Sequence, residues 1–174
     1  AHLERPLEFE PHVRLNDLDG RSGGLIAFSG ASEGALTKLL AEGQQSHAEI
    51  LLQKLQELFP ERLYIELARR GNEVEERAEA ALVELAYGRD LPLVATNPAN
   101  FAEPHMHKAH DAMLCIAGST HIDADERAKS NPESYVKTYH MMDEAFDDLP
   151  EAVQNTLVVA QRCAYAPPYR KPIL

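Results

Sequence analysis

Three histidines and a carboxylate, all of them residue types that bind transition metals, lie within seven residues of one another. They belong to the segment Pro104-His105-Met106-His107-Lys108-Ala109-His110-Asp111. In a helix, His107 shares one face with His110, three residues later, and with Asp111, four residues later. A zinc site needs neutral imidazoles that converge with a third or fourth ligand, and one helix cannot bring all three imidazoles onto one ion.

The alternative for this segment is a helix that packs against the core. An apolar stripe at helical spacing contains Met106, Ala109, His110 and Met113. Under this interpretation His110 is a hydrogen-bonded core residue, while His105 and His107 lie at the surface. We favour the packed helix and keep His105, His107 and His110 as weak metal candidates.

Two glycine-containing patterns do not match a catalytic or phosphate-binding motif. Ser29 lacks the Gly-x-Ser-x-Gly elbow of a nucleophilic serine, and the glycines at 23, 24 and 30 lack the Gly-Lys-Ser/Thr of a phosphate loop. We interpret these glycines as strand ends. An acidic run contains Glu73, Glu75, Glu76 and Glu79. It is most simply a solvated helix face, although such a face could also dock a basic partner.

The composition is typical of one globular domain. The chain has 174 residues, of which 44% are hydrophobic and 26% charged. No apolar run reaches the roughly 18 residues of a membrane span, and the polar start of the chain is unlike a signal peptide. Residue 1 is Ala rather than Met, so we expect a processed or excised chain. Cys115 and Cys163 lie in apolar helical patterns, so we expect reduced, buried thiols, with a disulfide as the open alternative.

The charge disfavours nucleic acid as a direct partner. With 28 acidic and 17 basic residues, the net charge is −11, and such a surface repels phosphate backbones. We therefore expect little direct DNA binding by this chain and no membrane partner. The one basic cluster, which we interpret as a solvated tail, contains Arg162, Arg170 and Lys171.

The hydrophobic pattern predicts an α/β fold with parallel strands. Short apolar runs near 24–29, 63–68 and 92–96 are the predicted strands, and amphipathic helical segments separate them. This alternation is typical of a parallel sheet with right-handed crossovers. Ser32 and Ser46 are the predicted N-caps of the first two helices, and Glu49 completes a capping box with Ser46. Three strands make a poor free-standing sheet, so we expect more strands in the intact fold.

The last third of the chain is predicted to be helical. The helical segments cover 104–117, 135–146 and a stretch that begins at Pro150, where proline suits a first turn. The predicted inner face of that last helix contains Val153, Thr156, Leu157, Ala160 and Cys163. The expected divisions are a connector over 1–20, a βαβ part over 21–103, a helical part over 104–165 and an extended exit over 166–174.

Five motifs follow one another along the chain. They are Gly24-Leu25-Ile26-Ala27-Phe28-Ser29-Gly30, Phe59-Pro60-Glu61-Arg62-Leu63-Tyr64-Ile65-Glu66-Leu67, Leu91-Pro92-Leu93-Val94-Ala95-Thr96-Asn97, Ala109-His110-Asp111 with Leu114-Cys115-Ile116, and Pro150-Glu151-Ala152 with Asn155-Thr156. Together they resemble the C-terminal portion of the PHP (polymerase and histidinol phosphatase) domain of bacterial C-family replicative polymerases, the DNA polymerase III alpha subunits. The resemblance implies a partial PHP (β/α)₇-barrel-like fold, followed by a helical part. The family's first metal motif, His-x-His, does not occur before residue 20.

The resemblance places three metal-ligand positions in this chain, and each holds a poor ligand. Arg70 stands where the family has a His, and Pro98 and Asn100 stand where it has Asp and His. A guanidinium has no lone pair, and an amide is a weak neutral ligand for a transition metal. We therefore expect no catalytic residue, metal or cofactor in this chain. The Arg70 charge either pairs with leftover carboxylates in the cavity or is an ordinary surface arginine.

The resemblance also implies a function. The parent would be a DNA-directed DNA polymerase, a nucleotidyltransferase of DNA replication in the cytoplasm. Family members with a degraded PHP site work beside a separate proofreading exonuclease that binds the PHP domain. We therefore expect an inactive scaffold that stabilises the rest of the alpha subunit and contributes to exonuclease docking. The rival hypotheses are a metal-dependent phosphoesterase or 3′–5′ exonuclease of the PHP type and a free-standing regulatory protein.

Overall fold

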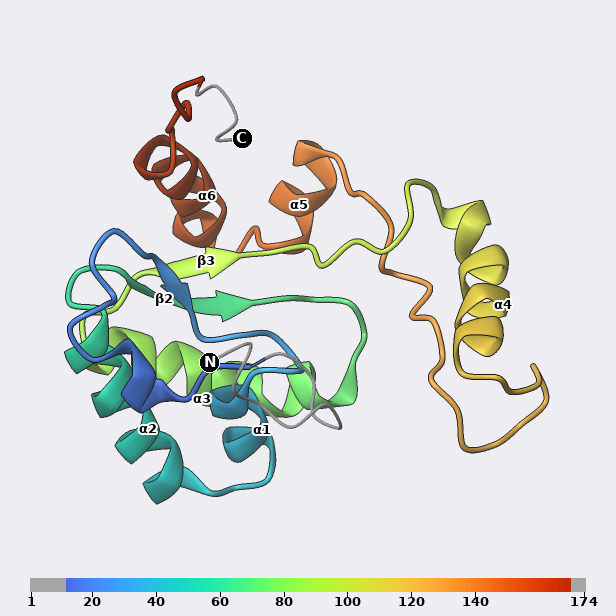
Figure 1. The fold of residues 1–174 in the computed structure, drawn as a ribbon, viewed down its shortest axis with the longest axis horizontal. Helices are drawn as coiled ribbons and strands as arrows, with labels where there is room; N and C mark the ends of the chain where they lie inside the picture. The colour runs from blue at the N-terminus through green and yellow to red at the C-terminus, as the bar shows by residue number, and fades with distance from the viewer. Residues whose placement is uncertain (1–11, 170–174) are drawn as a thin grey trace, which may run out of the picture.

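The computed structural model describes residues 12–169 (Figure 1). The expected connector over 1–20 and exit over 166–174 therefore lie partly outside the described residues, as do Arg170 and Lys171. A short 3-10 helix, η1 (Leu15–Leu18), precedes the first strand.

The centre of the molecule is a sheet of three parallel strands. These are β1 (Ala27–Phe28), β2 (Leu63–Leu67) and β3 (Leu93–Ala95), in the order β1-β2-β3. Ala27 lies opposite Leu63, and Ile65 lies opposite Leu93. The structure confirms the α/β class and the three predicted parallel strands. Strand β2 is almost entirely buried, which explains its nearly continuous apolar sequence.

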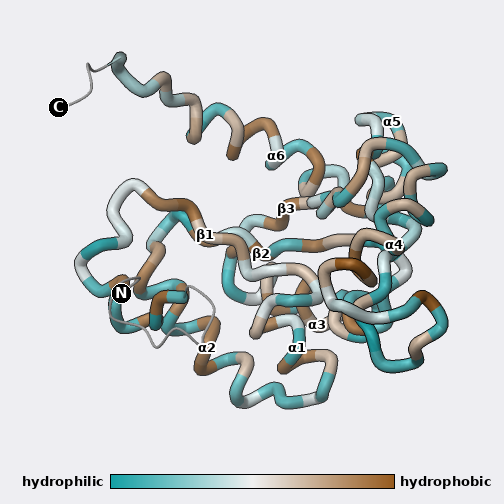
Figure 2. The backbone as a smooth tube through the Cα atoms, turned by 45° about the vertical axis from the view of Figure 1, so that its right-hand side comes forward, coloured by the Kyte–Doolittle hydropathy of each residue, from teal (hydrophilic) through white to brown (hydrophobic). Residues whose placement is uncertain are grey.

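Helices cover both faces of the sheet (Figure 1). On one side lie α1 (Ala35–Ala41), α2 (Gln45–Leu58) and α3 (Glu73–Gly88), and on the other lie α5 (Tyr139–Ala145) and α6 (Pro150–Arg162). Hydrophobic residues concentrate along the strands and alternate with hydrophilic ones along α6 (Figure 2). The core between these layers is apolar, and its fully buried large side chains include Leu36, Leu52, Ile65, Leu82, Leu93 and Phe146.

Two predicted helix starts differ from the structure. Helix α1 has Gly34 at its N-cap rather than Ser32, and α2 has Gln44 rather than Ser46, in neither case with a side-chain cap. The Ser32 hydroxyl instead accepts a hydrogen bond from Arg70, so a tertiary contact outcompetes local capping. Helix α3 is capped by a side chain, because Asn72 Oδ1 accepts the backbone N–H of Val74 at 2.9 Å.

Helix α6 covers the outer edge of β3. Its Asn155 side-chain amide donates to the carbonyl of Leu93 at 2.8 Å, which satisfies one edge acceptor of the strand. This contact turns Ala152 and Val153 inward, where both are buried. The predicted inner face of the helix is therefore partly wrong, because Leu157 and Cys163 are exposed. Cys115, by contrast, is buried, and both thiols are free.

After β3 the chain leaves the sheet and returns. We call residues 101–135 the arm, because an isolated parallel bridge between Phe101 and Tyr135 closes its base. The arm contains η2 (Pro104–Met106) and α4 (His107–Ala117), and α4 lies beyond the end of the sheet (Figure 1). The helix over 104–117 is thus confirmed, but the helix expected at 135 begins only at Tyr139, since Tyr135 is held extended by the bridge.

The orientation of α4 corrects a second prediction. Its expected inner stripe faces solvent, with Met106 and Met113 both exposed. The side carrying His107, His110 and Cys115 is covered instead. The part of the arm that follows the helix, residues 118–135, packs against this side, and we call it the returning part of the arm.

Arg69 joins α3, the end of α5 and the loop that leads to α6. Its Nη2 donates to Glu79 at 2.6 Å, and its Nη1 donates to Asp148 at 2.6 Å and to the carbonyl of Ala145 at 2.6 Å. The guanidinium also lies 4.6 Å from the ring centroid of Phe146, a cation–π distance. The hydrogen bond from Arg69 lowers the pKa of Asp148.

We predict that Arg69→Met destabilises the chain by about 2–3 kcal/mol, because it leaves the half-buried Glu79 carboxylate unpaired. Arg77→Met is the matched control, since Arg77 makes an exposed pair with Glu73 and should change the free energy of unfolding by less than about 0.5 kcal/mol. Urea denaturation measures both. Equal effects of the two substitutions would contradict the role of Arg69.

Candidate functional site

The carboxyl ends of the three strands open into one groove, the place where parallel α/β sheets bind ligands. We call it the strand-end groove; its volume is about 460 Å³. Its walls come from the turn after β1, the end of β2, the segment after β3 and the returning part of the arm. The lining residues that matter below are Ser32, Glu66, Arg70, Pro98, Asn100 and Ser134. The three positions singled out as degenerate ligands, Arg70, Pro98 and Asn100, thus come together.

The Arg70 side chain is only 12% exposed and forms an ion pair with Glu75, which is 5% exposed. Arg70 Nε lies 3.2 Å from Glu75 Oε1, and the same carboxylate accepts a second bond from Nη2. The other oxygen of Glu75 accepts the backbone N–H of Arg70 at 3.3 Å. Of the two arrangements considered for Arg70, the structure therefore has the one paired with a carboxylate.

Arg70 also contacts two segments that are distant in sequence. Its Nη2 donates to Ser32 Oγ at 3.0 Å, and its Nη1 lies 3.4 Å from Ser134 Oγ. Its carbonyl accepts a bond from the Asn131 amide at 3.1 Å. One side chain and its backbone thus connect the turn after β1, helix α3 and the returning part of the arm.

The segment after β3 fixes the base of the arm through its backbone and one side chain. The Asn100 N–H donates to the carbonyl of Ser134 at 2.8 Å, and the Asn97 amide donates to the carbonyl of Tyr135 at 2.8 Å. Ser134 is fully buried. Pro98 is half-buried and Asn100 exposed, and both line the strand-end groove. This part of the site is therefore a hydrogen-bonded contact between two segments, made by the backbone of Asn100 and the side chain of Asn97.

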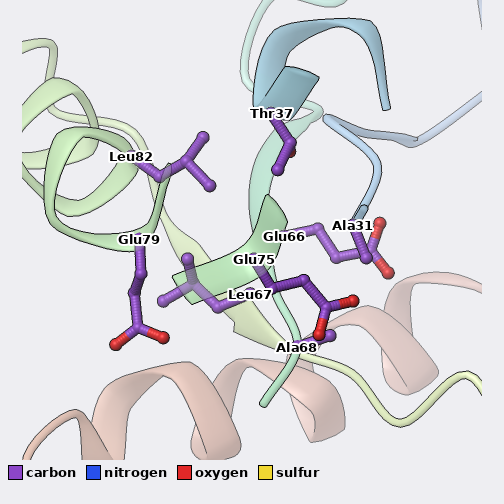
Figure 3. Close-up of a pocket in the computed structure, with 8 residues that line it drawn as sticks. All are labelled: Ala31, Thr37, Glu66, Leu67, Ala68, Glu75, Glu79 and Leu82. Carbon is purple, nitrogen blue, oxygen red and sulfur yellow. The ribbon is translucent and has the colours of Figure 1, made fainter. Parts of the chain in front are cut away.

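The carboxylates near the groove include those of Glu33, Glu66 and Glu75. Those of Glu66 on β2 and Glu75 on α3 extend toward the same side, near Ala31 and Ala68, whereas Glu79 points to the opposite side (Figure 3). Thr96 Oγ1 donates to Glu66 at 2.6 Å. The expectation that the run 73–79 is a solvated face is thus wrong for Glu75 and Glu79, because each pairs with an arginine that follows β2.

The turn after β1 leaves no room for a side chain at positions 30 and 34. Gly30 has a φ of +86°, and a Cβ on it would lie 2.6 Å from Gly34 Cα. A Cβ on Gly34 would lie 2.5 Å from the carbonyl oxygen of Ser29. The two glycines thus allow the chain to pass close enough for Ser32 to reach Arg70.

The donor set of the groove does not fit the metal cluster of a PHP phosphoesterase. The guanidinium of Arg70 bonds to the Glu75 carboxylate and offers no lone pair. Among residues 12–169, no group of three or more His, Cys, Asp or Glu side chains is arranged to hold a metal ion. We therefore derive no metal-dependent step from this site.

The histidines of the arm lie in a separate polar cluster. His107 Nε2 is 3.0 Å from the carbonyl of Ser130, and His110 Nδ1 is 2.7 Å from Ser130 Oγ. Asp111 accepts two bonds from Arg127, both at 2.8 Å. His107 is half-buried rather than at the surface. The exposed His105 pairs with Glu103 instead.

This cluster explains how the arm keeps its shape. Arg127 and the backbone N–H of Ser130 hold the pKa of Asp111 well below its usual range, because both donate to the charged carboxylate. The same pairing raises the pKa of Arg127. Sequence reasoning missed Arg127, Ser130 and Ser134. Arg127 lies in the nonperiodic segment after α4, sixteen residues from Asp111 on that helix, so no spacing rule connects them.

The described part of the chain contains no helix that is both long and apolar enough to cross a membrane.

Comparison with known proteins places these observations in a family. Residues 1–70 match the family model described as the PHP domain. The whole chain is 42% identical to a DNA polymerase III subunit alpha of Caulobacter vibrioides, and covers 15% of that protein. Over 80% of the chain, the identity is 39% to the subunit alpha of Pseudomonas aeruginosa and 36% to that of Escherichia coli, with 12% of each covered.

These similarities confirm the class that the motifs indicated, a PHP domain with a parallel α/β fold. The chain belongs to the PHP region of the DNA polymerase III alpha subunits. It spans 15% or less of the length of these relatives. The PHP match begins at residue 1, and the expected boundaries at 20, 103 and 165 stay predictions.

We predict that Glu75→Gln destabilises the chain by about 3 kcal/mol, because it leaves the Arg70 charge buried without its partner. Arg70→Met should have a similar effect, while the double substitution Arg70→Met/Glu75→Met should cost less than the sum of the singles. Glu73→Gln, in the same helix but exposed, is the control. Additive losses in urea denaturation would show that the two side chains are not coupled.

A second prediction concerns acid. Because the folded pKa of Asp111 is depressed, its contribution is present above its unfolded pKa of about 3.9 and is lost as the pH falls through the folded value. Hydrogen exchange of the Ser130 amide, which donates to Asp111, should therefore accelerate below about pH 4 beyond its intrinsic pH dependence. Asp111→Asn should remove this acceleration of the Ser130 exchange, and Asp125→Asn, in the same loop as Ser130, should keep it. If the Ser130 exchange still accelerates at low pH in Asp111→Asn, Asp111 is excluded as the cause.

Proposed function

We propose that this chain is a non-catalytic scaffold within a replicative DNA polymerase, in which an ion pair takes the place of a metal cluster. The carrying observation is the Arg70–Glu75 pair in the strand-end groove. A guanidinium where a ligand would be required supports a structural role, because it neutralises a buried carboxylate and binds no metal. The parent protein would be a DNA-directed DNA polymerase, a nucleotidyltransferase acting in the cytoplasm.

The scaffold would act by holding segments that the chain brings together at the strand ends. Arg70 connects the turn after β1, α3 and the arm, and Arg69 connects α3, the end of α5 and the loop that leads to α6. Both arginines follow β2 directly, so the end of this one strand organises the layers around it. No cofactor is required for such a role.

The partners that we propose are the rest of the alpha subunit and a proofreading exonuclease subunit. The family similarity supports the first, because the chain covers a small part of each relative. The exonuclease follows from the degraded site, since a polymerase without its own nuclease needs one in trans. The net charge of −11 supports assigning DNA binding to other parts of the polymerase.

The test is calorimetry with zinc and manganese, together with phosphatase and 3′-exonuclease assays on the intact PHP domain. We expect no stoichiometric binding and no metal-dependent turnover, because Arg70 offers a metal ion no lone pair and already pairs with the Glu75 carboxylate. Stoichiometric micromolar binding that disappears on substitutions near Arg70 and Asn100, with turnover, would favour the rival phosphoesterase or exonuclease.

A further inference from the structure

Helix α4 turns an apolar stripe toward solvent. Met113 is 64% exposed and Ile116 is 78% exposed, and Met106, about two turns before Met113 at the start of the helix, is 40% exposed. Ala109 and Ala117 lie on the same face and are also exposed. The spacing of these five residues is that of one continuous helical stripe, so together they form a surface, which we call the α4 stripe.

The opposite face of the same helix is polar but covered. His107 and His110 both contact Ser130, and Asp111 is bound by Arg127. The arm therefore uses its internal packing on the polar side and leaves the apolar side free. A helix in a folded protein normally turns its apolar side toward a partner, and a contiguous exposed apolar patch marks an interaction site.

The composition of the α4 stripe favours a permanent, closely packed contact. It contains no charged residue, and permanent interfaces are the more hydrophobic class. Its alanines allow a neighbouring backbone to approach closely, while methionines adapt to the surface that they meet. The matched relatives are far longer than this chain, which covers 15% of the Caulobacter protein, so most of such a polypeptide is available as a partner.

We propose that the α4 stripe is an intramolecular docking surface, covered by an apolar surface of the same polymerase polypeptide outside this chain. The proposal rests on the proposed function, because it requires the chain to be part of the longer subunit. It adds the face through which the PHP region meets the remainder. The polar cluster around Ser130 would then position α4 for this contact.

The test is oxidation footprinting of Met113 in the complete polymerase subunit. Methionine oxidation follows exposure to solvent, so a covered Met113 should react at least about tenfold more slowly than an exposed methionine. Ile50→Met supplies the matched reference in the same molecule, since Ile50 is 68% exposed on α2 among polar neighbours. The rates are read by mass spectrometry of the two peptides.

A second variant, Ile116→p-benzoylphenylalanine, identifies what covers the stripe by photo-crosslinking. A cross-link to a peptide of the same polypeptide outside residues 1–174, with Met113 protected, is the expected result. Equal oxidation of Met113 and the reference methionine would overturn the proposal. Protection that appears only when an exonuclease subunit is added, with a cross-link to that subunit, would also overturn it.

These outcomes are separate from the fate of the proposed function. Metal-dependent turnover by the intact PHP domain would end the scaffold interpretation while leaving Met113 protected. An exposed Met113 in a complete subunit that binds no metal would end the docking proposal alone.

Discussion

The pairing of Arg70 with Glu75 is the contact on which the strand-end groove depends. Two carboxylates, Glu66 and Glu75, extend to the same side of the sheet end (Figure 3), and a buried carboxylate without a counter-ion costs several kcal/mol. In a metal-binding PHP domain that charge would be balanced by cations. Here the guanidinium of Arg70 balances the charge of Glu75 and donates its remaining hydrogen bonds to Ser32 and Ser134. The turn after β1 and the returning part of the arm therefore pack around this one side chain.

The arm depends on this centre at its base and on its own polar cluster farther out. Arg70 and the backbone of Asn100 hold Asn131 and Ser134 beside the sheet, and Asp111 with Arg127 holds the outer loop against α4. Both sets of contacts lie on the inner side of the arm. As a result, the apolar side of α4 faces away from the other residues that the structure describes.

The strands and the long helices could be predicted because their patterns are local. The apolar run 63–67 has one compatible structure between its turns, and the 3.6-residue period over 73–88 defines a helix by itself. The orientation of α4 could not be predicted in this way, because its apolar stripe fits an internal core and an external partner equally well. The sequence predicts that Ser32 caps a helix, but its hydroxyl instead accepts a hydrogen bond from Arg70, which is 38 residues away. Contacts between residues so far apart produce no periodic pattern in the sequence. The roles of Arg127 and Ser134 could not be predicted for the same reason.

The central claim is that the ion pair of Arg70 with Glu75 stabilises this fold in place of a metal cluster. The most direct measurement is the melting temperature of the intact PHP domain with a chelator and with zinc or manganese at about 100 μM. A metal with a micromolar dissociation constant would add about 2.7 kcal/mol of stability at a hundredfold excess, equal to several degrees in the melting temperature. The account predicts the same melting temperature in all conditions. A rise of several degrees with metal, lost when the groove around Arg70 is altered, would contradict it.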